Sequence, residues 1–201
     1  GLRGMAFEEI DRIRGEEIGD RDWSADVVDE GWQGLIDPLE LERLRRILRD
    51  QQKGEIAKLG DEALLRSLQL LVPSPRRLLA TRAAILLVGR EEAIRAHAPN
   101  HEVKLQRFDR DELNPALSED LRAGLLAVVQ RAAEIIQTVN TAEMFQAGLF
   151  RVEVPKFPER AYREAIVNAM CHRDYGRRGN VAIRIHGQRI EVGSPGGWYG
   201  G

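Results

Sequence analysis

Hydrophobic positions in the first third of the chain recur at spacings of three and four, which is typical of amphipathic helices. One stripe directly follows Asp37 and Pro38, which suit the N-cap and the first position of a helix. A second stripe, made of leucines, follows Asp61 and ends before Pro73. The sequence therefore predicts a mainly helical segment over residues 1–75.

The pattern changes after this segment. Residues 83–88 form a continuous apolar run closed by a glycine, which favours a strand buried on both faces and leaves a helix as the alternative. Residues 101–108 alternate and predict a second strand. A long helix is then expected to begin at Asn114 and Pro115, or at Ser118. Its apolar face comprises Leu117, Leu121, Leu125, Val128, Ala132, Ile135 and Val139.

The last third combines strand and helix patterns. Residues 150–154 alternate as a strand, and residues 158–171 have the periodicity of a helix. Two short alternating runs separated by Gly187 predict a β-hairpin. We therefore expect an α/β (α+β) protein, in which the helical N-terminal part is followed by an α/β domain over residues 76–201.

Composition narrows the class of protein. The 201 residues are enough to bury a core, and 43% of them are hydrophobic. No stretch approaches the roughly 20 apolar residues of a membrane helix, and the charged first residues lack the apolar core of a signal peptide. Cys171 is the single cysteine, which excludes an internal disulfide and a cysteine-rich metal site. We expect a soluble, cytoplasmic protein that does not associate with membranes.

The charge is distributed unevenly along the chain. Residues 1–40, which include an acidic helical pattern over residues 5–20, carry twelve acids against four arginines. Residues 160–189 carry seven arginines against two acids, which is typical either of an anion-binding region or of a solvated surface. Within this region Arg177 and Arg178 lie in a glycine-flanked turn. They are candidates for contact with nucleic-acid phosphate, and a plain solvated loop is the alternative.

One face of the predicted helix over residues 158–171 carries polar groups that suit catalysis. At about 100° per residue, Glu164, Asn168 and His172 fall within an arc of about 80°, and the apolar residues lie opposite. A carboxylate can accept a proton from an attacking water. An amide oxygen one turn later can ligate a Mg²⁺ ion that bridges phosphate oxygens. An ordinary amphipathic helix with a polar outer face is the alternative.

A longer string around this helix resembles a known signature. From Arg163 to Tyr175 the chain reads R-E-A-I-V-N-A-M-C-H-R-D-Y, which closely resembles the REAxxNAxxHRDY signature of a prokaryotic family. Members of that family are described as transcriptional regulators or as ATP-dependent DNA helicase RecG-related proteins. Further matches occur in family order: residues 5–10, residues 81–89 (TxAaiLlFG), residues 150–155, and residues 189–197 (DRiEixNPGG).

The resemblance implies a particular domain organisation. In that family a Schlafen-type (Alba-type) DNA-binding domain precedes a domain that resembles GHKL ATPases. The chain would then be the middle of a longer regulator, excised together with the beginning of its GHKL-like domain over residues 151–201. DNA would be a partner of the full-length protein. ATP and Mg²⁺ would be its cofactors.

The resemblance also assigns roles to residues. It would make Glu164 the catalytic base and Asn168 the Mg²⁺ ligand acting through the nucleotide. The residues implied to contact the cofactor are Asn168, His172, Arg173, Asp174, Gly196 and Gly197. From the residues alone, His172 and Arg173 could instead bond the terminal carbonyls of the helix. Gln188 and Ser194 stand where the family has Asp and Asn.

The resemblance and the residues together limit the expected activity. The later GHKL elements that form the ATP lid and the second glycine box do not occur in the chain, so we expect this chain alone to lack ATPase activity. No G-x-x-x-x-G-K-[ST] motif is present, which excludes a P-loop helicase motor for this segment. Whether the full-length parent is an enzyme stays open.

Two other functions fit the same sequence. One is a non-enzymatic interaction or dimerisation module with a degenerate N-box, in which the long helix over residues 116–139 serves packing or homo-oligomer formation. The other is a basic nucleic-acid-binding surface around residues 160–189, which is compatible with either of the first two functions.

Overall fold

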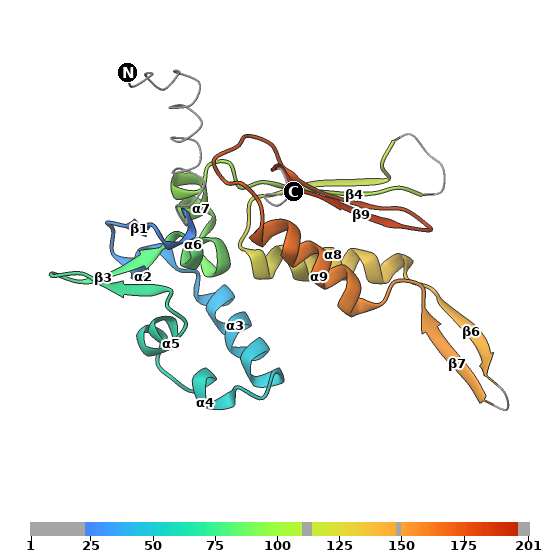
Figure 1. Ribbon diagram of the computed structural model, residues 1–201, viewed down its shortest axis with the longest axis horizontal. Coiled ribbons are helices and arrows are strands. Elements are labelled where there is room, and N and C mark those ends of the chain that lie inside the picture. Colours follow the sequence, from blue (N-terminus) through green and yellow to red (C-terminus); the bar gives the residue numbers. More distant parts are fainter. Residues whose placement is uncertain (1–22, 110–113, 148–149, 197–201) are drawn as a thin grey trace, which may run out of the picture.

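The computed structural model describes residues 23–109, 114–147 and 150–196 (Figure 1). These residues form an α+β fold, so the expected fold class is confirmed. Their buried apolar side chains gather into two hydrophobic cores, one in each half of the chain. The acidic helix predicted over residues 5–20 and the candidate residue Gly197 lie outside the described residues.

The first core is built mainly from helices that surround a small antiparallel sheet with the strand order β1-β3-β2. The elements of this half are η1 (Trp23–Ala25), β1 (Val27–Val28), α2 (Trp32–Leu35), α3 (Pro38–Asp50), α4 (Gly54–Ala57), α5 (Asp61–Ser67), β2 (Leu71–Pro73), β3 (Leu78–Thr81), α6 (Arg82–Val88) and α7 (Glu91–His97). Leu64, Leu65 and Ile85 are completely buried in it. Their removal from water is the main term that stabilises this half.

Helix α3 begins where the sequence predicts. The Asp37 carboxylate accepts a hydrogen bond from the backbone N–H of Leu39 at 2.8 Å, which satisfies one of the free donors of the first turn. On the inner side of the helix the Arg45 guanidinium is buried. It donates to the carbonyl oxygens of Ala57 and Leu59 at 2.7 and 2.6 Å. One buried cation therefore fixes the chain that follows α3 against the helix.

The helix predicted behind Asp61 is confirmed as α5, but it is shorter than expected. It ends at Ser67, and Gln69 has a φ of 58°. This left-handed conformation turns the chain out of the helix. Leu71, which the pattern counted on the apolar side of the helix, consequently begins strand β2.

Residues 83–88, expected as a buried strand, belong instead to helix α6. The Thr81 hydroxyl accepts a hydrogen bond from the N–H of Ala84 at 3.1 Å and caps the helix. Ala84, Ile85 and Val88 are completely buried, whereas the residues between them are half-buried. A run in which every position is apolar has no period, so the pattern could not separate a strand from a helix.

The second core lies between a four-stranded sheet and two helices. The elements of this part are β4 (Val103–Arg107), β5 (Leu117–Leu121), α8 (Leu125–Val139), α9 (Glu159–Cys171), β8 (Val181–Ile185) and β9 (Ile190–Gly193). The strand order is β5-β4-β8-β9; β4 and β8 are parallel and the other pairs are antiparallel. Both helices lie on the same side of the sheet (Figure 1). The predicted strand over residues 101–108, the helix over residues 158–171 and the C-terminal hairpin are confirmed.

The long predicted helix starts later than expected, after its N-cap Gly124. Leu117 and Leu121 belong to strand β5, which pairs with β4. They are four positions apart, and this spacing places two residues on one face of a strand as well as of a helix, so the pattern was ambiguous. A Cβ atom on Gly124 would lie 2.9 Å from the carbonyl oxygen of Leu87, so glycine allows α8 to begin close to the end of α6.

Helix α8 buries its apolar stripe inside the second core. Val128, Ala132, Ile135 and Ile136 are all buried there. Of the two roles that one alternative function gave this helix, packing or dimerisation, the buried stripe serves packing. Within the three described ranges, none of the helices has the length and the apolar character that would be needed to cross a bilayer.

A two-stranded ribbon connects α8 to α9. It consists of β6 (Ala142–Ala147) and β7 (Phe150–Pro155), paired antiparallel. The sequence predicts β7, but its pattern gave no indication of β6. In Figure 1 the ribbon projects away from both cores.

Candidate functional site

Helix α9 separates its residues into a buried and an exposed side. Tyr162, Ile166 and Met170 are buried in the second core. The side chains of Glu164, Asn168 and His172 are exposed on the other side of the helix. Throughout the described part of the chain, these three polar side chains have no hydrogen bond or ion pair. They are consequently free to bind a ligand.

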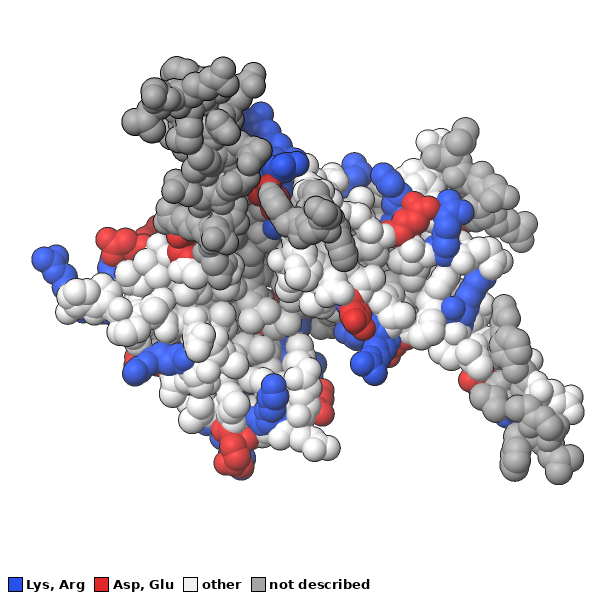
Figure 2. Space-filling view, viewed as in Figure 1, with Lys and Arg blue, Asp and Glu red and all other residues white. Residues whose placement is uncertain are grey.

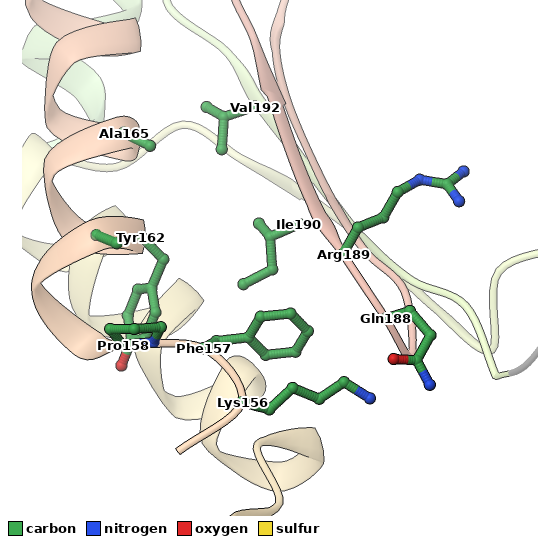
Figure 3. A pocket seen from close by; sticks show the side chains of 10 residues that line it. Lys156, Phe157, Pro158, Tyr162, Ala165, Gln188, Arg189, Ile190 and Val192 are labelled. Carbon is green, nitrogen blue, oxygen red and sulfur yellow. The ribbon is translucent and has the colours of Figure 1, made fainter. Parts of the chain in front are cut away.

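A cavity of about 340 Å³ lies between the beginning of α9 and strand β9 (Figure 3). Apolar groups form most of its lining, and Lys156, Gln188 and Arg189 lie on the side away from the helix. The remaining lining residues are Phe157, Pro158, Ala161, Tyr162, Ala165, Ile190 and Val192. The cavity thus combines an apolar lining with cationic groups, an arrangement common in small-molecule sites.

The cavity and the polar residues of α9 share one side of the helix. Ala161 and Ala165 line the cavity. Asn168 and His172 follow them at spacings of three and four, which places all four positions on one stripe of the helix. We use the name α9 groove for the cavity together with this stripe of the helix as far as His172. Glu164 lies at its margin, one turn before Asn168.

The end of α9 is joined to the turn that follows β9. The backbone N–H of Asp174 donates to the carbonyl oxygen of Pro195 at 3.2 Å. Gly196 has a φ of 141° and Gly179 a φ of 128°, conformations that favour glycine. A Cβ atom on Gly179 would also lie 2.9 Å from the Pro195 ring. The structure therefore brings Asp174 and Gly196, far apart in the sequence, to the same end of the groove.

Asp174 stabilises its own loop. One carboxylate oxygen accepts a hydrogen bond from the N–H of Gly176 at 2.9 Å, and the other lies 3.0 Å from the Arg177 guanidinium. These contacts make Asp174 a residue that shapes the turn behind the helix. They also neutralise one of the two arginines considered for phosphate contact.

Arg173 lies inside the protein, not in the groove. Its guanidinium donates to the carbonyl oxygens of Asn100 and Gly179, each at 2.6 Å, and its side chain is buried. It stacks over the Tyr175 ring at 5.0 Å. Both roles left open for Arg173 are therefore wrong, because it lies outside the groove and the carbonyls that it binds belong to neighbouring loops and not to the end of the helix.

The basic segment is partly neutralised by its own acids. Arg189 and Arg184 both approach Glu191, at 2.6 and 3.9 Å, and hydrogen bonding from Arg189 holds the pKa of Glu191 below its ordinary value. Arg178 is exposed and makes no ion pair within the described residues. On the face shown in Figure 2, basic and acidic side chains are interspersed. On that face the charges form no continuous basic track for a nucleic-acid backbone.

Two further features bear on the chemistry of the groove. Burial raises the pKa of the Cys171 thiol, so at neutral pH it is a protonated side chain and a poor nucleophile. Within the described ranges, no three His, Cys, Asp or Glu side chains are grouped so that they could hold a metal ion. A metal bound at Asn168 would therefore depend on oxygens supplied by a ligand.

Sequence reasoning missed the cavity residues. Lys156 and Phe157 come directly after strand β7, and Gln188 and Arg189 form the turn between β8 and β9. Periodicity does not single out such residues, because they lie outside regular elements. The available signal was their position immediately before the helix and the strand that carry the signature.

The comparisons with known proteins concern mainly the fold. A domain of unknown function, DUF8451, matches residues 11–104, which include most of the first core and exclude the α9 groove. Among solved structures, the DIP2311 protein from Corynebacterium diphtheriae is similar with a TM-score of 0.71 and 24% identity. The match covers 89% of this chain and 34% of that protein, so the chain spans about a third of its length. No curated protein matches the chain.

Proposed function

We propose that the α9 groove is the Mg²⁺–nucleotide site of a GHKL-like domain in a DNA-binding transcriptional regulator of the RecG-related type. One observation carries the proposal. The unpaired Glu164 and Asn168 lie on the helix whose Ala161 and Ala165 line the cavity, and the end of this helix is bonded to Pro195 in the turn that contains Gly196. Helix, cavity and glycine turn are the parts that the resemblance implies for a nucleotide site.

The residues of the groove fit such a ligand. The Asn168 side-chain oxygen would bind the Mg²⁺ ion, which when bound would neutralise phosphate charge. Lys156 makes no ion pair within the described residues and would offer a further cation. Glu164 would hold the proton of an attacking water in the full-length protein. Gly196 would allow backbone to approach the ligand closely.

The groove of this chain is open to solvent. Ala161, Ala165, Gln188 and Arg189 line the cavity and are themselves exposed. Because a site that does not exclude water stabilises developing charge poorly, we expect weak Mg²⁺-dependent binding without turnover. In the family that the chain resembles, DNA contact belongs to the Alba-type domain, so this chain would supply the part that responds to nucleotide.

The test is isothermal titration of ATP into the 201-residue chain with and without Mg²⁺. We expect binding that needs Mg²⁺ and is lost in Asn168→Ala. Glu159→Ala serves as the control, because Glu159 is an exposed residue of α9 that is absent from the cavity lining and pairs with Arg163. Equal affinity in Asn168→Ala and the control would overturn the assignment. Turnover that Glu164→Ala abolishes would contradict the expected inactivity of this chain.

A further inference from the structure

The ribbon of β6 and β7 projects from the protein and adds no described side chain to either hydrophobic core. Its side chains that are described, at positions 142, 144, 146, 151 and 153–155, belong to neither hydrophobic core. Met144 is 62% exposed and Val154 is 40% exposed. An isolated two-stranded ribbon is marginally stable in water, and its outer edges present unpaired backbone groups to other strands. Packing in the two cores therefore does not account for the stability of the ribbon.

The base of the ribbon is held firmly. The Asn140 side chain donates to the carbonyl oxygen of Phe157 at 2.9 Å and accepts from its N–H at 2.8 Å. The N–H of Lys156 donates to the carbonyl oxygen of Thr141 at 3.0 Å. These three hydrogen bonds close the two strands at the point where they leave the body of the protein. They give the projecting ribbon a defined direction.

Strand β7 is complementary to a second copy of itself. It reads F-R-V-E-V-P, so that Arg151 and Glu153 flank Val152 symmetrically. Both charged side chains are exposed and have no ion pair among the described residues. If two copies of β7 pair antiparallel about Val152, each Arg151 faces the partner's Glu153. Opposite charges at directly facing positions stabilise a strand pair, and like charges destabilise it.

We propose that β7 is a dimerisation strand that pairs edge to edge with β7 of a second copy of this chain. The pairing extends the two ribbons into one four-stranded antiparallel sheet and removes the exposed β7 edge from each copy. Val152 lies on the two-fold axis, which makes the contact identical for both copies. A strand with one isolated charge, or with two charges of the same sign, would not have this complementarity.

The first experiment measures the oligomeric state of the whole chain by sedimentation over a range of concentrations. We expect a dimer whose dissociation constant rises at least tenfold in Arg151→Glu and in Glu153→Arg, because each change places like charges opposite each other. The double variant Arg151→Glu/Glu153→Arg restores the opposite signs and should restore the dimer. Arg76→Glu is the control, because Arg76 is also an exposed arginine next to a strand but belongs to the first half.

The second experiment tests the register. In a Cys171→Ser background, Val152→Cys should form an intermolecular disulfide on mild oxidation, because directly facing residues of antiparallel strands lie within disulfide reach. Val154→Cys should not, because its facing position is residue 150 of the second copy. Circular dichroism verifies that all variants remain folded.

The proposal is overturned by a monomer at all concentrations, by a double variant that does not dimerise, or by equal crosslinking through positions 152 and 154. A dimer that is unaffected by either charge reversal likewise places the interface elsewhere. The proposal does not rest on nucleotide binding, so titration of the same variants with ATP separates its failure from that of the proposed function.

Discussion

His172 and Arg173 are neighbours in the sequence, yet they enter two regions of opposite character. His172 joins Glu164 and Asn168 on the exposed side of α9, where the three side chains have no partners in the described part of the chain. Arg173 enters a buried junction with Tyr175 and His101. A polar side chain taken from water must find hydrogen bonds inside the protein, whereas an exposed one keeps water as its partner. The buried region therefore contributes to stability, and the exposed region is the one for which we propose ligand binding.

The junction connects elements from both halves of the chain. Tyr175 stacks on Trp23 with ring centroids 4.8 Å apart, and Arg82 lies over the Trp23 ring at 4.7 Å. The Asn100 side chain donates to the carbonyl oxygen of Tyr175 at 3.1 Å. Tyr175 belongs to the signature, and it can thus contribute to stability by joining the two halves without contacting a ligand. We therefore expect substitutions in the junction to change the free energy of unfolding strongly, and substitutions in the groove to change it little.

The largest effect is expected for Arg173→Ala. It leaves the carbonyl oxygens of Asn100 and Gly179 without their charged donor and should lower the free energy of unfolding by about 3 kcal/mol. Arg173→Lys should rescue little, because an ammonium cannot reproduce the planar fork. Urea unfolding monitors the change, with exposed Arg178→Ala as the control at within about 0.5 kcal/mol. Similar losses in the two alanine variants would contradict the distinction between junction and surface.

A smaller loss is expected for Tyr175→Phe. The change keeps the ring that stacks on Trp23 and removes the hydroxyl that donates to the carbonyl oxygen of Met170 at 2.9 Å. The free energy of unfolding should fall by about 1 kcal/mol. Burial raises the pKa of Tyr175 to about 12, so an alkaline absorbance titration should lose its last ionising tyrosine in this variant. Loss of an earlier ionisation, with the last one retained, would place the hydroxyl in water.

The junction should also respond to acid through His101. Burial lowers the pKa of this ring below 6.5, its Nε2 lies 2.9 Å from the Ala123 carbonyl oxygen, and nearby Arg173 acts in the same direction as burial. The unfolded chain therefore binds a proton more readily than the folded one. The contribution of the neutral His101 ring to the free energy of unfolding is fully present above pH 6.5. It declines as the pH falls from 6.5 to the lower pKa of the folded state. His101→Gln should flatten this part of a stability–pH profile, and an unchanged slope would assign the acid sensitivity to other groups.

The smallest effect on stability is expected in the groove. Asn168 is exposed and unpaired, and alanine has the higher helix propensity, so Asn168→Ala should change the free energy of unfolding by no more than about 0.5 kcal/mol. The same variant should lose Mg²⁺-dependent nucleotide binding. Unfolding curves and titrations on one preparation measure both. A marked destabilisation would indicate that Asn168 belongs to the structural network.

Periodicity predicted the elements that are determined by residues close to one another in the sequence. The two sides of α9 followed from its spacing of three and four, because residues on one side of a helix are set by the helix itself. The cap at Asp37 and the C-terminal hairpin could be predicted for the same reason, because each depends on residues that are near in the sequence. Where the spacing fits two structures, as at Leu117 and Leu121 or in the apolar run of α6, the pattern could not decide. There the pairing of β5 with β4 and the Thr81 cap selected the structure.

The helical period was enough to assign the polar groups that share one side of α9. The inward position of Arg173 depends instead on tertiary contacts, because Asn100, whose carbonyl it binds, is 73 positions away. Tertiary contacts also place the cavity against β9 and the ribbon outside both cores. These features depend on contacts between distant segments, whose positions are fixed by the packing of the whole chain and not by the period of any one element.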